Sequence, residues 1–94
     1  MATSVPALTP EVVAPPQDFT RTILDVIRDA LDERQWSLYK LIKVGGLDMT
    51  RAYRWFRCGY SPTLDELVLI AAALDMSLVS LIAEAKHRYD EAAR

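Results

Sequence analysis

The sequence predicts an all-α protein, a compact bundle of about five short helices. Two observations support this prediction. Apolar residues recur at three- and four-residue spacing over most of the chain from residue 18 onward, as in helices that bury one face. Residue types that begin helices, at Ser37, Asp48, Thr63 and Ser77, divide this pattern into segments of helical length.

The first helix is expected over residues 19–34. Its apolar positions are Ile23 or Leu24, then Ile27, then Ala30 or Leu31. Most of the residues between them are charged, and the outer face is predominantly acidic. We therefore expect this face to be turned away from any nucleic acid.

A short second helix and a tight turn follow. Ser37 is a suitable N-cap for a helix over residues 38–44, and Gly45-Gly46 ends it with a left-handed C-cap. Leu47 can then return to the core, and Asp48 can cap a third helix. Two short helices joined by about four residues have the helix-turn-helix shape, in which the second helix can enter a major groove.

The stretch from Asp48 to Arg57 has two chemically distinct faces. At 100° per residue, apolar and aromatic side chains occupy one arc and polar or cationic ones occupy the other. The apolar arc holds Met49, Ala52, Tyr53, Trp55 and Phe56. The polar arc holds Thr50, Arg51, Arg54 and Arg57. Such an arc is either a solvated surface or a nucleic-acid contact.

Two more helices are expected after a loop at residues 58–62. Thr63 and Glu66 form a capping box for an almost wholly apolar helix up to Leu74, which is expected to be buried at the centre of the bundle. Ser77 caps a last helix from Leu78. That helix carries a heptad-like seam, which is either a dimer contact or one side of a frayed tail. The seam consists of Leu78, Ile82, Ala85, Tyr89 and Ala92.

These patterns divide the chain into three parts. Residues 1–17 contain four of the five prolines and almost no charge, which predicts a disordered Pro-rich arm. Residues 18–84 are expected to form the helix-turn-helix domain. Residues 85–94 are expected to be a C-terminal helical extension or tail.

The composition indicates one small soluble domain. The 94 residues are 51% hydrophobic and 26% charged, and no apolar run is long enough to span a membrane. The N-terminal stretch does not resemble a signal peptide, and the single Cys58 excludes an intrachain disulfide. We therefore expect a cytoplasmic protein.

Charge is distributed unevenly along the chain. The net charge is −2, which by itself argues against an acidic partner. The segment from residue 34 to residue 57, however, holds six basic residues and one acid, Asp48, and so carries +5. Attraction to phosphates depends on the local patch within a Debye length of roughly 8–10 Å more than on the total charge.

With these landmarks in place, the chain from about Ile23 to Ile82 resembles the Cro and lambda-repressor-like helix-turn-helix family, often called XRE-type, of phage and bacterial transcription regulators. The similarity lies in the spacing of ordered landmarks rather than in any one of them. They are Ser37, Leu41, Gly46-Leu47, Ala52, Trp55, Pro62, Leu64, Leu67, Ile70-Ala71, Leu74, Ser77-Leu78 and Leu81.

The resemblance implies a lambda-repressor-like DNA-binding domain and a set of contact residues. The positions that match base-reading residues are Met49, Thr50, Tyr53 and Arg54. The positions expected to hold phosphates or flanking DNA are Ser37, Lys40, Lys43, Arg51, Arg57 and Tyr60. Arginine can contact guanine N7 and O6 with two hydrogen bonds, threonine can bond a base or contact a thymine methyl, and methionine makes apolar contacts only.

Two positions depart from the family pattern. Many relatives have glutamine as the first residue of the second helix, where this chain has Leu38. The glycine that usually ends the recognition helix is replaced by Cys58, with Gly59 one residue later. The C-cap is therefore expected one residue further on, which alters how Arg57 and Tyr60 point.

The resemblance implies a repressor or Cro-like regulator that binds an operator in double-stranded DNA as a homodimer, in the nucleoid of a prokaryotic or phage-infected cell. The dimer surface suggested by the seam is Leu78, Ile82, Ala85 and Tyr89. The alternative is a protein-interaction module, or an antitoxin subunit, that keeps the same fold.

No pattern typical of an enzyme is found. The sequence has no Cys/His cluster, no nucleophile-base motif and no phosphate-binding glycine loop, so we expect no catalysis, no metal, no cofactor and no small-molecule ligand. Cys58 and the isolated His87 are expected to have no catalytic or ligand role, and Trp36 and Trp55 are expected to belong to the core.

Overall fold

The structure is a computed structural model that describes residues 16–92. The described residues form five helices and no strand. These helices are α1 (Pro16–Arg34), α2 (Leu38–Gly45), α3 (Met49–Cys58), α4 (Leu64–Ala73) and α5 (Leu78–Ala92). The all-α prediction is therefore confirmed for this part of the chain.

Helix α1 begins three residues earlier than predicted. Its first residue is Pro16, and Asp18 lies in its first turn. Proline suits the first turn of a helix because its missing N–H would have no intrahelical partner there, and an acidic residue there interacts favourably with the helix dipole. Residues 16 and 17 of the predicted arm over residues 1–17 are therefore helical, and residues 1–15 lie outside the described part of the chain.

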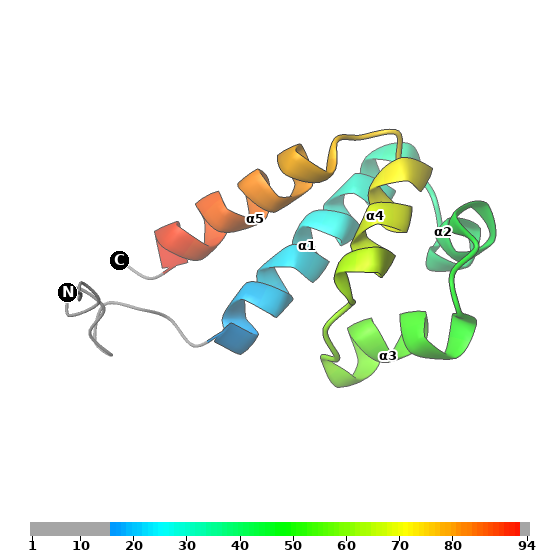
Figure 1. Cartoon of the computed structure of the whole chain (residues 1–94), viewed down its shortest axis with the longest axis horizontal. Helices are drawn as coiled ribbons and strands as arrows, with labels where there is room; N and C mark the ends of the chain where they lie inside the picture. Colours follow the sequence, from blue (N-terminus) through cyan, green and yellow to red (C-terminus); the bar gives the residue numbers. More distant parts are fainter. Residues whose placement is uncertain (1–15, 93–94) are drawn as a thin grey trace.

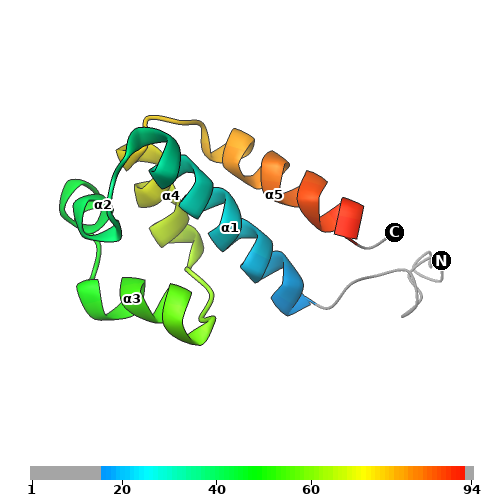
Figure 2. The same ribbon diagram turned by 180° about the vertical axis from the view of Figure 1, so that it is seen from behind.

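Helices α1 and α5 lie side by side along most of their lengths, as the two opposite views show (Figures 1 and 2). At one end the rings of Phe19 and Tyr89 meet edge to face, with 5.3 Å between their centroids. Further along α1, Arg88 bonds Asp29 at 2.8 Å. Ala85, one turn before Tyr89 on α5, is fully buried.

This packing corrects the interpretation of the C-terminal seam. Within the chain, Tyr89 of the seam packs on Phe19 of α1 and Ala85 is fully buried, whereas Ala92 at the end of the seam is exposed. Helix α5 runs without a break across residues 84 and 85, so the helix gives no reason to divide the chain at that point. Because Ala85 has no exposed surface, it cannot contact a second copy in this conformation.

The core lies where the buried sides of all five helices meet. Its largest fully buried side chains are Ile27, Leu41, Trp55, Ile70, Leu74 and Leu81. Of the two tryptophans, Trp55 belongs to this core and Trp36 is half-buried against it. The prediction that helix α4 lies wholly inside the bundle was wrong, because Leu64, Val68 and Leu69 are exposed.

The helix ends follow the predicted caps. The Ser37 hydroxyl accepts a hydrogen bond from the Lys40 N–H at 3.1 Å. Thr63 and Glu66 form the expected capping box. The Ser77 hydroxyl accepts from the N–H groups of Val79 and Ser80. These side chains satisfy N–H groups that have no partner within their own helices.

Within residues 16–92, no single helix is long and apolar enough to cross a membrane. Helices α4 and α5 reach that length and composition only as a pair, and they are bent by 109° at the turn between them.

Candidate nucleic-acid interface

Helix α3 is held at both ends and along its inner side. Its N-cap, Asp48, accepts a hydrogen bond from the Arg51 N–H at 2.9 Å. At the other end Gly59 adopts the left-handed conformation, with φ of 75°, and its N–H reaches the Arg54 and Trp55 carbonyls. The C-cap is therefore at Gly59, as the displaced glycine predicted. Ala52 and Trp55 are fully buried and fix the rotation of the helix about its axis.

The outer side of α3 brings together all four predicted base-reading residues. Together with Arg57 they line a shallow surface hollow, and the lining residues are Met49, Thr50, Tyr53, Arg54 and Arg57. The Arg57 guanidinium lies 5.9 Å from the centre of the Tyr53 ring, a cation–π distance that keeps the charge on this side of the helix. Tyr53 is half-buried, so it supports Arg57 from the edge of the core.

Arg54 is the cation in this hollow whose side chain makes no ion pair, hydrogen bond or ring contact with another described residue. An exposed guanidinium in this state keeps its five N–H donors for a partner. The planar fork of these donors matches a guanine edge or a phosphate.

Arg51, one turn before Arg54 and Trp55, has a different environment. Its Nε donates to Glu66 Oε2 at 2.6 Å, and its Nη2 donates to Glu66 Oε1 at 3.0 Å. The hydrogen bonds and charge of Arg51 are the main reason that the pKa of Glu66 falls to about 2, and this pairing also raises the pKa of Arg51. The structure therefore shows Arg51 bound to α4, not free for a phosphate as the sequence analysis expected.

Glu66 links the first turns of two helices. The same Oε1 atom that accepts from Arg51 also accepts from the Thr63 N–H at 2.8 Å, as the N3 residue of the capping box. One carboxylate thus caps α4 and ties α3 to it. Sequence reasoning found the capping box but missed the link to Arg51, because the two residues are 15 positions apart and no local pattern joins them.

The predicted phosphate contacts on α2 remain exposed. Lys40 Nζ lies 4.9 Å from the centre of the Trp36 ring, and Lys43 Nζ lies 5.7 Å from the centre of the Tyr39 ring. Neither lysine forms an ion pair with a described residue. Both ammonium groups lie at the surface beside an aromatic ring.

Ser37 and Tyr60 occupy the two ends of this region. The Ser37 oxygen is engaged as the N-cap of α2. Tyr60 is exposed in the loop after α3, and its N–H reaches the Arg54 carbonyl over 3.4 Å. Arg34, the first cation of the basic segment, donates to the carbonyl oxygens of Ala30 and Leu74 and so stabilises helix ends. The basic segment therefore presents fewer free charges than its sequence suggests.

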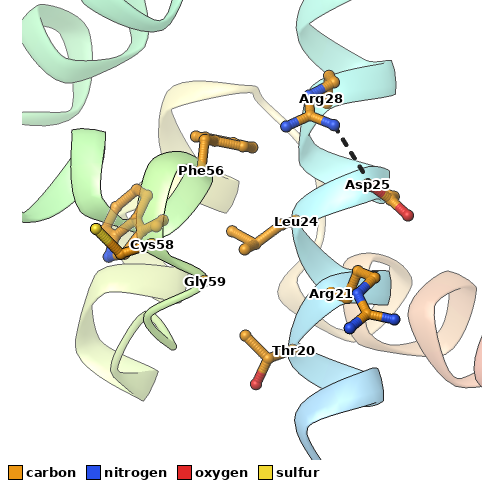
Figure 3. Close-up of a pocket in the computed structure, with 9 residues that line it drawn as sticks. Thr20, Arg21, Leu24, Asp25, Arg28, Phe56, Cys58 and Gly59 are labelled. Atoms are coloured by element: carbon orange, nitrogen blue, oxygen red, sulfur yellow. Dashed lines mark ion pairs between the residues drawn. The ribbon is translucent and has the colours of Figure 1, made fainter.

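A separate cavity of about 480 Å³ lies between α1 and the C-terminal end of α3 (Figure 3). Leu24 points into it from α1, and Arg28 lies over the Phe56 ring at 4.9 Å. Arg28 is also paired with Asp25 at 3.6 Å. Because both arginines of its wall pair with carboxylates of their own helix, Arg21 with Asp18 and Arg28 with Asp25, we assign this cavity no ligand.

The described residues contain no group of three His, Cys, Asp or Glu side chains that could hold a metal ion. Cys58 is exposed at the end of α3. Comparison of the chain with protein-family models, with curated proteins and with solved structures finds no match.

Proposed function

We propose that the protein is a sequence-specific DNA-binding transcription regulator that inserts α3 into the major groove of a duplex. The observation that carries the proposal is the division of α3. Ala52 and Trp55 lock its inner side in the core, whereas Thr50 and Arg54 are exposed on its outer side. A helix so anchored can present side chains to base edges at a fixed angle.

The arrangement of α2 and α3 supports this proposal. Three residues, 46–48, join them, which is the spacing of a helix-turn-helix. In the proposed complex α3 is the recognition helix and α2 lies across the sugar-phosphate backbone. The protein then acts as the Cro and lambda-repressor-like regulators do, by occupying an operator.

The side chains of the hollow receive distinct roles. Arg54 reads guanine with two hydrogen bonds, and Thr50 contacts an adjacent base edge or a thymine methyl. Met49 and Tyr53 add apolar contacts. Arg57, held over the Tyr53 ring, contacts the backbone at the end of the helix, with Tyr60 beside it.

Lys40 and Lys43 supply the phosphate contacts on α2, near the Ser37 cap. Arg51 is not assigned a phosphate contact, because its guanidinium is hydrogen-bonded to Glu66. The net charge of −2 is compatible with the proposal, because Lys40, Lys43, Arg54 and Arg57 lie on two consecutive helices.

The proposal is tested by selecting bound duplexes from a random library and then measuring variants by fluorescence anisotropy. Arg54→Ala and Thr50→Ala are expected to lower affinity for the selected duplex by about 1–3 kcal/mol, with little effect on random duplex DNA. Lys43→Ala is expected to weaken both duplexes to a similar degree.

Arg21→Ala provides the matched control, because Arg21 is an exposed arginine on α1 that pairs with Asp18 at 3.3 Å. It is expected to leave both affinities unchanged. Equal losses on selected and random DNA for Arg54→Ala and Thr50→Ala would contradict the base-reading roles.

A second candidate function is a protein-interaction module. The observation that favours it is the exposed apolar and aromatic surface around the turn, at Tyr39, Val44 and Met49. Such surfaces are typical of protein contacts. The absence of any salt-dependent binding to duplex DNA at micromolar protein would favour this candidate over a DNA-binding regulator.

A further inference from the structure

The exposed side of α4 is apolar. Leu64 is 74% exposed, Val68 49% and Leu69 42%, and Ala72 is exposed beside them. We call these four residues the α4 apolar face. Leu64, Val68 and Ala72 are spaced four residues apart and form a continuous stripe, with Leu69 at its edge. An apolar stripe of this kind on a helix surface indicates a contact site.

Helix α4 packs into the core through residues other than those of the α4 apolar face. The core side of the helix is formed by Leu67, Ile70 and Ala71, which occupy the neighbouring arc. From Leu67 to Leu74 the helix carries no charged residue on any side. The polar face that a surface helix normally turns to water is therefore missing over the last two turns of α4.

We propose that the α4 apolar face packs against the same face of a second copy of this chain, around a two-fold axis that runs along α4. The direction of the axis rests on the proposed function. The surface replaces the α5 seam, in which Ala85 is fully buried and Tyr89 packs on Phe19 of α1.

The position of α4 relative to α3 favours a second copy as the occupant. In both views α3 lies at the bottom of the molecule and α4 extends upward, away from it (Figures 1 and 2). Rotation by 180° about an axis along α4 leaves both α3 helices at the same end of the dimer. A palindromic duplex requires this arrangement of its two recognition helices.

The charge distribution also suits a copy of the same chain. A two-fold axis places each residue of the α4 apolar face opposite the same residue of the second copy, so charged residues in this face would repel each other. Leu64, Val68 and Ala72 carry no charge. At 100° per residue, Asp65 falls between Ala72 and Leu69 around the helix, and the axis places the two Asp65 carboxylates on opposite sides of the contact.

The size of the face predicts a weak dimer. Four side chains per copy are far fewer than the roughly 20–30 residues that each partner contributes to a stable interface. Association is therefore expected at high protein concentration in solution, and two adjacent half-sites on DNA are expected to strengthen it by holding the copies together.

Sedimentation equilibrium of the full chain without DNA, from about 10 μM to about 1 mM, tests the proposal over the range expected for weak complexes. Wild type is expected to associate reversibly to a dimer. Leu64→Lys and Leu64→Glu are each expected to weaken association at least about tenfold, because each places two like charges on the axis. An equimolar mixture of the two variants is expected to restore a heterodimer.

Val79→Lys is the matched control, since Val79 is 76% exposed and lies on α5 outside the α4 apolar face. It is expected to associate like wild type. Leu64→Gln, which adds no charge, keeps the test meaningful if a charged variant unfolds, as circular dichroism would detect. It too is expected to weaken association.

Three results would overturn the proposal. The first is a wild type that is monomeric at every concentration, and the second is a set of Leu64 variants that associate normally. The third is a heterodimer that forms when Leu64→Lys is mixed with Ala72→Glu but not when it is mixed with Leu64→Glu. The last result would mean that the two α4 helices run antiparallel. Since no DNA is present, these outcomes are independent of duplex binding, and a dimer that binds no duplex would remove only the proposed function.

Discussion

At the scale of single residues, the side chain of Glu66 joins α3 to α4. It accepts hydrogen bonds from Arg51 of α3 and from the backbone of Thr63, and it is 15% exposed. A surface ion pair between mobile side chains contributes little to stability. This one has two parallel hydrogen bonds and a carboxylate already fixed as a cap, so less entropy is lost when it forms.

The pairing makes stability depend on pH in the acidic range. The pKa of Glu66 is about 2 in the folded protein, below its ordinary value of 4.5. The stabilising contribution is thus complete above about pH 5 and is lost as the pH falls toward 2. Glu66→Gln is expected to lower the melting temperature by a few degrees at pH 7 and to differ less from wild type as the pH approaches 2.

Thermal unfolding followed by circular dichroism between pH 2 and pH 7 measures this difference. Asp65→Asn, one residue away and exposed, is the control for general loss of a negative charge in the first turn of α4. A gap between Glu66→Gln and wild type that stays constant across this range would contradict the role of the Glu66 charge.

At the scale of secondary-structure elements, three of the helices end in the same way. After α1, α2 and α4, an N–H returns to the carbonyl five residues earlier, from Trp36 to Leu31, Leu47 to Ile42 and Met76 to Ala71. This is the Schellman arrangement, which needs a left-handed residue just before the donor. Glycine provides it after α2, at Gly46, but Gln35 and Asp75 provide it after α1 and α4.

Gln35→Gly is expected to stabilise the protein by about 0.5–1 kcal/mol, because Gln35 adopts φ of 56° and glycine relieves the contact between its Cβ and the backbone. Urea unfolding measures the change. Glu33→Gly, inside α1, is the control and is expected to destabilise by about 1 kcal/mol. A loss of stability in both variants would show that the left-handed turn carries no strain.

The packing of α5 on α1 gives a second prediction at this scale. Ala85→Asp is expected to destabilise by at least about 2 kcal/mol, because it places a carboxylate at a position with no exposed surface. Ala83→Asp, exposed two residues earlier on the same helix, is expected to change stability by no more than about 0.5 kcal/mol. Similar urea midpoints for the two variants would indicate that α5 is frayed beyond Glu84.

At the scale of the whole molecule, the charge available to DNA is smaller than the sequence suggests. Of the six cations from Arg34 to Arg57, Arg34 bonds helix carbonyls and Arg51 bonds Glu66. The cations of α2 and α3 that form no ion pair with a described residue are Lys40, Lys43, Arg54 and Arg57.

This distribution predicts the salt dependence of duplex binding. Three of these cations, Lys40, Lys43 and Arg57, are assigned to phosphates, which gives a slope of log affinity against log salt of about −2.7 for each protomer. Lys43→Ala is expected to reduce the slope by about one, and Arg51→Gln is expected to leave it unchanged because that charge is already neutralised. Anisotropy titrations from low to moderate salt measure both, and a slope lowered by Arg51→Gln would show that Arg51 leaves Glu66 to contact DNA.

The sequence alone determined the five helices of the described residues, the starts of α2 to α5 and the two sides of α3. Capping by Ser37, Asp48 and Thr63 acts over three residues, and amphipathic spacing acts over three or four, so both are visible as local patterns. The inward positions of Ala52 and Trp55 followed from the same periodicity and were confirmed.

Only the tertiary structure decided which charges are free and which apolar faces are covered. The Arg51–Glu66 bond joins residues 15 apart and the Arg34–Leu74 bond joins residues 40 apart. In the α5 seam Tyr89 packs on α1 and Ala85 is fully buried, whereas the apolar stripe of α4 stays exposed. Periodicity shows that a helix has an apolar side, but the partner of that side depends on how the whole chain returns on itself.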